Sequence, residues 1–328
     1  MIIAVADMHL GSQRANKSGF TEFILKFLEP NQDDISRIVL LGDILDLWRK
    51  PNSQVLLENL DIMTKLSRLD MKKNYLVGNH DYAVFSLLNQ GNISAPPEST
   101  GVLDRVSKTL ELTHDGLQMK FIHGHQVDYW PALQFYEVFS QAMCFVDIEN
   151  QELSDVWNIV YRFAESLPDK TRDLVRTISK ETQNALERKL AGPLDAQKEK
   201  AGLYYEWKLL RQVSDFEDVA NCYSKSVKEI EQFAEEWEQI LKVIDDYPES
   251  TTPPSHLATE VHQKRREAAA LTVGLQENEF LIRGHSHSPY VDQNERVADA
   301  GCWLGRRGAY LAIKEGQVSV HEWKSMND

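Results

Sequence analysis

Short apolar runs alternate with stretches of helical periodicity over the first third of the chain. The strand-like runs are residues 2–6, 37–41 and 74–77, and apolar residues recur at helical spacing over about 18–29 and 53–68. Short buried strands that alternate with amphipathic helices are typical of βαβ units and a parallel sheet. The first third therefore predicts a βαβαβ arrangement.

Further strand-like runs occupy the region after residue 108 and the C-terminal part of the chain. Asp115-Gly116 and Glu315-Gly316 each separate two such runs, and glycine accepts the positive φ that tight hairpin turns require. The strands predicted in these regions are 109–113, 117–122, 280–283, 296–300, 308–314 and 317–323. Both ends of the chain are therefore expected to form sheets.

The stretch from about 131 to 248 has a different pattern. Its apolar residues recur at helical spacing, as at Val156, Val160 and Ala164, and it contains no convincing strand. A further helix is expected between the Pro253-Pro254 pair and about residue 275. The pattern predicts an α/β core of residues 1–129 and 251–328, interrupted by a helical insertion at 130–250.

Composition excludes several classes of protein. The 328 residues are 42% hydrophobic, which is enough for a full core, and the formal charge of −14 disfavours a protein that mainly binds nucleic-acid backbone. The three cysteines are far apart in sequence, so neither a disulfide framework nor a thiolate zinc site is predicted. Without a run of roughly 20 apolar residues, we expect a cytoplasmic protein with no transmembrane segment, and peripheral membrane contact is left open.

Five polar motifs follow predicted strands, and they contain most of the residues suited to chemistry. Taken singly, each has a simpler explanation as a helix cap, a turn or a structural histidine. However, the carboxyl ends of several strands meet at one edge of such a sheet, so the motifs are expected to converge. They are Asp7-Met8-His9, Gly42-Asp43, Gly78-Asn79-His80-Asp81, His123-Gly124-His125 and Gly284-His285-Ser286-His287.

Carboxylate, amide and imidazole donors without thiolate match manganese, iron or zinc. About seven such donors are too many for one ion. Two ions about 3.5–4 Å apart that share a carboxylate would use all of them, and such a pair clamps the attacking and leaving oxygens at phosphorus. Gly42 and Gly78 are expected to let the backbone approach this crowded centre.

In this order, the five motifs resemble those of the calcineurin-like metallophosphoesterases, over residues 1–129 and 255–323. The resemblance implies a four-layer αββα sandwich with a dinuclear metal centre on the strand-end loops. It implies that Asp43 bridges two divalent ions, manganese first, with iron or zinc as alternatives. The other ligands would be Asp7, His9 and His287 for one ion, and Asn79, His123 and His285 for the other.

The mechanism expected from such a centre needs no protein nucleophile. A water bridging two divalent ions has its pKa lowered towards neutrality, and the resulting hydroxide can attack phosphorus in line. His80, next to Asn79, is the candidate acid for the leaving oxygen, with Asp81 holding its imidazole. In the family pattern the first histidine of His123-Gly124-His125 is the ligand, so His125 is expected beside the metal or the substrate.

Three stretches are similar to the UDP-2,3-diacylglucosamine hydrolases, which are pyrophosphatases: residues 41–48, 123–128 and 284–289. This similarity marks Asp46 and Asp128 as residues near the ligands or the substrate. The chain departs from that family at His80, where the family has arginine, and at His125, where it has aspartate. The helical insertion is also longer here, and because it leaves after His123 and returns before His285, we expect it to cap the site.

Three functions remain open from the sequence. The first is a two-metal phosphohydrolase that cleaves a phosphoester or pyrophosphate, as in a nucleotide-linked lipid such as UDP-2,3-diacylglucosamine. The second is a phosphodiesterase or nucleotidase on soluble nucleotides, which His80 favours because a protonating histidine assists a poor leaving group. The third is a non-catalytic scaffold, which the intact set of predicted ligands disfavours. The expected partner is therefore a phosphorylated small molecule or a nucleotide-linked lipid.

Overall fold

A computed structural model describes residues 1–50, 52–84, 105–128 and 255–324, together with single positions between 137 and 236. The chain divides into two compact units. The first unit consists of Met1–His125, Met143–Phe145 and Leu275–Asp328, and the second of Gln126–Ala142 and Val146–Gly274. The candidate ligands, which the sequence places at the ends of strands, all belong to the first unit.

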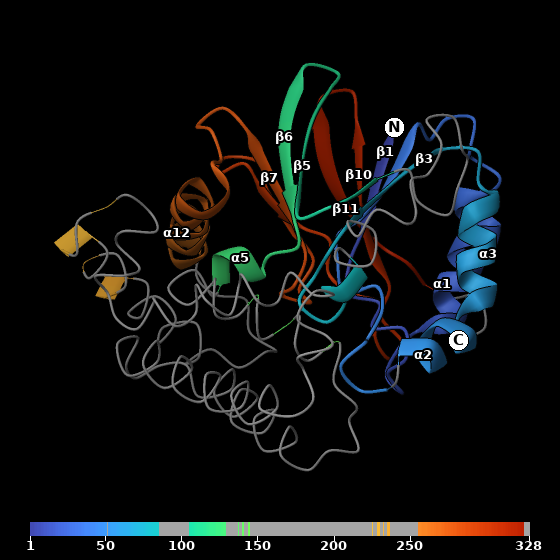
Figure 1. The fold of residues 1–328 in the computed structure, drawn as a ribbon. Helices are drawn as coiled ribbons and strands as arrows, with labels where there is room; N and C mark the ends of the chain where they lie inside the picture. Colours follow the sequence, from blue (N-terminus) through green and yellow to red (C-terminus); the bar gives the residue numbers. More distant parts are fainter. Residues whose placement is uncertain are drawn as a thin grey trace, which may run out of the picture. The chain divides into compact units, whose positions relative to one another are not determined.

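Two mixed β-sheets form the first unit (Figure 1). The six-stranded sheet has the order β11-β10-β1-β2-β3-β4, with β1 (Ile2–Val5), β2 (Arg37–Leu40), β3 (Lys72–Leu76), β4 (Arg105–Ser107), β10 (Ala309–Lys314) and β11 (Gln317–Glu322). The five-stranded sheet has the order β5-β6-β7-β9-β8, with β5 (Thr109–His114), β6 (Leu117–Ile122), β7 (Phe280–Arg283), β8 (Tyr290–Asp292) and β9 (Val297–Asp299). The predicted mixed α/β class is confirmed.

Parallel pairing places the loops of the candidate site at common edges. Strands β1, β2 and β3 are parallel neighbours, with Ile3 opposite Ile38 and Val39 opposite Asn74. In the other sheet β6 and β7 are parallel, with Phe121 opposite Ile282. Because parallel strands end at the same edge, the loops after β1, β2 and β3 meet, as do the loops after β6 and β7.

Alternation of side chains along the strands divides the core between two faces. Leu311 of β10 belongs to the apolar cluster shared with Phe121 and Ile282 of the other sheet. Its neighbour Tyr310 points to the opposite face, where its ring lies 5.0 Å from that of Phe23. The six-stranded sheet therefore packs on the second sheet with one face and on a helix with the other.

The helices of the first unit lie together beside the six-stranded sheet (Figure 1). They are α1 (Lys17–Phe23), which continues as a π-helical turn (Ile24–Leu28), α2 (Asn52–Glu58) and α3 (Leu60–Arg68). The Asn16 side chain caps α1 by accepting a hydrogen bond from the Gly19 backbone N–H at 3.0 Å.

The prediction of a single helix over about 53–68 is wrong, because the structure has a break at Asn59 between α2 and α3. The side chain of Asn59 donates to the carbonyl oxygen of Val55 at 2.7 Å. An asparagine that bonds to nearby backbone competes with regular helical hydrogen bonding. The short strands β4 and β8 were likewise not predicted.

The second unit contains α12 (Ser255–Val273). The helix α5 (His125–Asp128) begins at His125, which belongs to the first unit, and its other residues belong to the second unit. The predicted helical insertion at 130–250 lies almost entirely outside the described residues, and the predicted domain boundaries stay a prediction. None of the helices in the described part of the chain has the length and apolar character that a bilayer span requires.

Candidate metal centre

The loops that follow β1 and β2 are joined by backbone hydrogen bonds. The Asp7 N–H donates to the carbonyl oxygen of Gly42 at 3.1 Å, and the His9 N–H donates to that of Asp43 at 2.8 Å. Leu10 continues the pattern with Ile44 at 2.9 Å. These bonds fix the side chains of Asp7, His9 and Asp43 at one sheet edge.

The loops after β6 and β7 reach the same place from the other sheet. The Gly284 N–H donates to the His123 carbonyl at 2.7 Å, and the His285 N–H donates to Asp7 Oδ2 at 2.7 Å. A third bond, from the Trp303 N–H to the Asp7 carbonyl at 3.0 Å, also connects Asp7 to the chain that follows β9. Asp7 is therefore held between the two sheets.

Seven acidic and histidine side chains form three overlapping groups, which we call the donor groups. Within each group the potential ligand atoms lie within 4.8 Å of one another. The groups are Asp7 with His9 and His287, His9 with Asp43 and His80, and Asp43 with His123 and His285. The residues predicted as ligands from motifs far apart in sequence are thus brought together.

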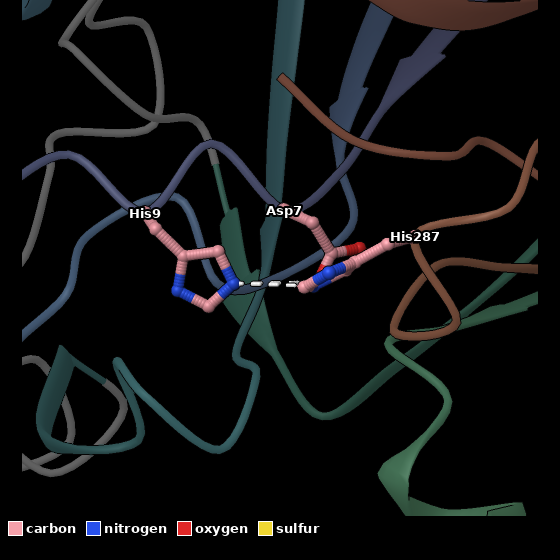
Figure 2. A group of neighbouring side chains, drawn as sticks. All are labelled: Asp7, His9 and His287. Carbon is pink, nitrogen blue, oxygen red and sulfur yellow. Dashed lines mark hydrogen bonds and ion pairs between the residues drawn. The ribbon is translucent and has the colours of Figure 1, made fainter. Parts of the chain in front are cut away.

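Figure 2 shows the first donor group. The His9 and His287 rings approach each other with their Nε2 atoms 3.4 Å apart, beside the carboxylate of Asp7. Asp7 Oδ1 lies 3.3 Å from Nε2 of His287 and 3.8 Å from Nε2 of His9. Three potential ligand atoms therefore point at a common position.

Asp43 lies between the first donor group and the histidines of the second sheet. Its Oδ2 is 3.7 Å from His9 Nε2 and 3.4 Å from His123 Nε2. The His123 Nε2 atom also lies 3.2 Å from Asn79 Oδ1 and 3.2 Å from His285 Nδ1. A single carboxylate thus faces two separate sets of donors.

Five of the candidate ligands have a left-handed backbone conformation, which is costly for residues other than glycine. The other non-glycine residues with positive φ in the part of the chain that the structure describes, Asp115, Arg296 and Glu315, lie in turns. Each left-handed non-glycine residue costs roughly 1 kcal/mol or more, and such strain clusters at functional sites. The five are Asp7 (φ 52°), His9 (46°), Asp43 (51°), His285 (75°) and His287 (57°).

Two glycines give the backbone the room that the centre needs. A Cβ atom on Gly42 would lie 2.7 Å from His123 Nδ1 and 2.6 Å from the backbone nitrogen of Gly78. A Cβ atom on Gly78 would overlap the carboxylate of Asp43. The prediction that these glycines permit close approach is confirmed.

Burial and mutual charge control protonation in the centre. Burial alone would raise the pKa of Asp43, but the imidazole of His123 holds it well below its ordinary value. Burial would lower the pKa of His123, yet Asp43 and Asp7 raise it to about 10. Burial and the charge of His80 lower the pKa of His9 to about 4. Near neutral pH the carboxylates are therefore ionised and attract positive charge.

The donor set fits divalent metal ions. Asp7 Oδ1 and His9 Nδ1 are buried and have no hydrogen-bond partner among the described residues. A buried oxygen without a hydrogen-bond donor is costly, and a cation would satisfy it. Carboxylate, amide and imidazole donors match the preferences of manganese, iron and zinc.

His80 is oriented by residues of the β2 loop. Its Nδ1 lies 3.2 Å from Asp46 Oδ1, and its ring stacks on Trp48 with centroids 4.0 Å apart. Burial alone would lower the pKa of His80, but Asp43 and Asp46 raise it. Only 12% of the His80 side chain is exposed. The structure thus gives Asp46, a predicted site residue, a definite contact with His80.

From the sequence, Asp81 was expected to orient His80. In the structure the oxygens of Asp81 form other contacts. Asp81 Oδ1 accepts the Gly78 N–H at 2.6 Å, and Oδ2 accepts the Ile44 N–H at 2.8 Å. These bonds clamp the β3 loop to the β2 loop. Asp46 occupies the orienting position because the β2 loop folds back against His80.

The other two residues predicted near the ligands or the substrate are His125, which lies beside the donor groups, and Asp128, which lies in the second unit. His125 is fully buried, and its ring centroid lies 5.5 Å from that of His123, but the donor groups among the described residues do not include it. Asp128 belongs to the second unit, where its Oδ1 is 3.7 Å from Arg265 Nε. The predicted substrate roles of His125 and Asp128 stay predictions.

A buried ion pair that the sequence analysis did not single out supports the loop after β7. Arg283 and Asp299 are both fully buried, with Arg283 Nε 3.2 Å from Asp299 Oδ2. Ser286, between His285 and His287, donates its hydroxyl to Asp299 Oδ2 at 2.7 Å. A signal for this pair exists in the sequence, because each charge interrupts or ends an apolar strand.

Comparisons with known proteins do not identify a family. No protein-family model matches the chain, and a search of curated protein sequences finds no match.

Proposed function

We propose that this protein is a dinuclear-metal phosphohydrolase with the four-layer fold of the calcineurin-like metallophosphoesterases. The observation that carries the proposal is the position of Asp43, which belongs to two of the three donor groups. A carboxylate shared between two sets of donors is the arrangement expected of a two-metal site. The left-handed conformation of five candidate ligands supports it.

The donor groups support a division of the candidate ligands between two ions. Asp43 would contact both, and the remaining ligands would be Asp7, His9 and His287 for one ion, and Asn79, His123 and His285 for the other. Two divalent ions, manganese first with iron or zinc as alternatives, would neutralise phosphoryl charge and lower the pKa of a water molecule at the site.

His80 is the residue proposed to protonate the leaving oxygen. Asp46 contacts Nδ1, so we assign proton donation to the other ring nitrogen, Nε2, and the stack on Trp48 fixes the ring plane. Asp46 stabilises the protonated imidazole in this position. The competing assignment is metal ligation, since His80 also forms a donor group with His9 and Asp43.

The test uses the manganese-loaded protein and bis(p-nitrophenyl) phosphate. We expect hydrolysis that a chelator abolishes and manganese restores. His80→Gln should lower kcat by about 10²–10⁴-fold, the usual contribution of a general acid, for a diester with an alkoxide leaving group. It should have a much smaller effect on bis(p-nitrophenyl) phosphate, whose p-nitrophenolate leaves without a proton, and the metal content should stay at two ions. His114→Gln, at a hairpin turn, is the matched control and should behave as wild type.

Two outcomes would contradict these assignments. A protein that holds two ions but hydrolyses no phosphoester or pyrophosphate would fit the non-catalytic scaffold. A His80 variant as fast as wild type on the diester with an alkoxide leaving group would remove the proton-donor role, and a variant that loses one ion would make His80 a ligand.

The two enzymatic functions that remain open differ in their substrate. The similarity of residues 41–48 to the UDP-2,3-diacylglucosamine hydrolases supports a nucleotide-linked lipid. His80 supports the second candidate, a phosphodiesterase or nucleotidase on soluble nucleotides. Release of a nucleoside monophosphate from the lipid substrate would favour the first, and hydrolysis restricted to soluble diesters would favour the second.

A further inference from the structure

Arg49 lies beside the centre and is connected to it through Asp46. Arg49 Nε is 3.0 Å from Asp46 Oδ2, and the same oxygen lies 3.8 Å from Nδ1 of the candidate ligand His9. The other oxygen of Asp46 contacts His80 Nδ1 at 3.2 Å. One buried carboxylate therefore joins a candidate ligand, the proposed acid and a guanidinium group.

Exposure shows that Arg49 extends from this centre towards solvent. The side chains of Asp46 and His9 are 0% and 8% exposed, whereas that of Arg49 is 46% exposed. Arg49 and His80 contact the two oxygens of the same Asp46 carboxylate, so the guanidinium lies close to the proposed acid. A substrate that enters from solvent would meet Arg49 at this position.

The chemistry of arginine suits a phosphate at this position. The guanidinium is permanently charged and has five N–H donors, and the ion pair with Asp46 uses Nε. Its planar fork matches two oxygens of a phosphate group. Asp46 already faces His80, so a single negative charge is shared between two cationic groups. The neighbouring Lys50, by contrast, pairs with Glu58 at 2.7 Å.

We propose that Arg49 forms an anion subsite that binds a second phosphate of the substrate, on the leaving-group side of the metal centre. This inference rests on the proposed function and narrows its substrate class to phosphoanhydrides, such as nucleoside diphosphate derivatives. A phosphoester whose leaving group has no charge would not use the subsite. Arg49 would thus set specificity between two kinds of phosphorylated substrate.

The alternative role for Arg49 is to hold Asp46 in place, and the two roles predict different results. A residue that only positions Asp46 affects every substrate to the same extent, since Asp46 orients His80 in each reaction. A residue that binds the second phosphate affects only ligands that have one. Comparison of ligands with one and with two phosphates therefore separates the roles.

The experiment titrates manganese-loaded wild type, Arg49→Gln and Lys50→Gln with inorganic phosphate and with methylenediphosphonate, by calorimetry. We expect Arg49→Gln to weaken methylenediphosphonate binding by roughly 10–100-fold, as loss of a charge-assisted hydrogen bond does, and phosphate binding by less than about threefold. In parallel, kcat/KM should fall by a similar factor for uridine diphosphate glucose but not for bis(p-nitrophenyl) phosphate. Lys50→Gln removes a neighbouring charge and should match wild type.

Equal losses for both ligands, or no loss for either, would overturn the subsite. Failure of the proposed function has a different signature: wild type would hold two ions yet hydrolyse neither substrate. The binding titrations decide the role of Arg49 in that case as well, because they require no turnover.

Discussion

The two sheets contribute different chemistry to the candidate metal centre. The loops of the six-stranded sheet supply all the oxygen donors among the candidate ligands, with one imidazole: Asp7, Asp43, Asn79 and His9. The loops of the five-stranded sheet supply only imidazoles: His123, His285 and His287. Negative charge is therefore concentrated on one sheet, and the groups that compensate it come largely from the other.

Backbone hydrogen bonds join the loops within each sheet, as between Asp7 and Gly42 in one sheet and between Gly284 and His123 in the other. The loop after β7 has the buried Arg283–Asp299 pair as a further support. The bond from the His285 N–H to Asp7 Oδ2 connects the two sets. Because a complete donor set exists only when both sheets are packed together, metal binding should stabilise that packing.

The largest effect is expected when the shared carboxylate is removed. Asp43→Ala deletes the donor that faces both sheets, so both ions should be lost. Activity should fall by more than the roughly 10–100-fold that follows loss of a residue supporting a ligand. Metal analysis and the rate of phosphodiester hydrolysis measure this, with the surface variant Asp61→Ala as control. Two ions and wild-type activity in Asp43→Ala would refute the bridging role.

Removal of one imidazole tests whether the contributions of the sheets are separable. His285→Ala removes a donor from the group with Asp43 and His123 but leaves Asp7, His9 and His287 intact. The metal content should fall from two ions to one, and hydrolysis should be lost. Full occupancy of both positions in this variant would show that His285 is not a ligand.

A smaller effect is expected from the hydroxyl that supports the second loop. Ser286→Ala removes the hydrogen bond to Asp299 between two candidate ligands. Metal affinity should weaken by about 10–100-fold, the usual effect of losing a ligand's orienting partner. Ser286→Thr retains a hydroxyl and should recover most of the affinity, and Ser67→Ala on α3 is the control. If the alanine and threonine variants are equal, the hydroxyl does not orient the loop.

The smallest effect concerns backbone strain. His287 has a φ of 57°, so His287→Gly should make the metal-free protein more stable than His287→Ala. The difference should be roughly 0.5–1 kcal/mol, since the left-handed cost of about 1–2 kcal/mol is partly offset by the entropy of glycine in the unfolded chain. Both variants should lose metal affinity. Chemical denaturation with a chelator present measures the free energy of unfolding, and a less stable glycine variant would remove the argument from strain.

Much of the fold could be predicted because its strands are short apolar runs with clear ends. β4 and β8 were missed because their residues are at most partly buried, whereas β9, which is equally short, is fully buried and was predicted. The break at Asn59 was missed because a side-chain bond to Val55 interrupts an otherwise helical pattern. The periodicity of apolar residues indicates which residues are buried, but it does not reveal a side chain that competes for a backbone hydrogen bond.

The convergence of the candidate ligands could be predicted because the ends of parallel strands share an edge. Their left-handed conformations could not, since no residue pattern distinguishes His9 or Asp43 from an ordinary loop residue. The contact between Asp46 and His80 spans 34 positions in sequence and depends on the fold of the β2 loop. The neighbouring Asp81 was the simpler choice from sequence, but its oxygens accept backbone N–H groups.

We propose that residues of both sheets hold two metal ions on either side of Asp43. Anomalous scattering from a manganese-soaked crystal tests it most directly. We expect two peaks about 3.5–4 Å apart, one beside Asp7, His9 and His287 and the other beside Asn79, His123 and His285, with Asp43 between them. A single peak, or peaks away from these residues, would contradict it.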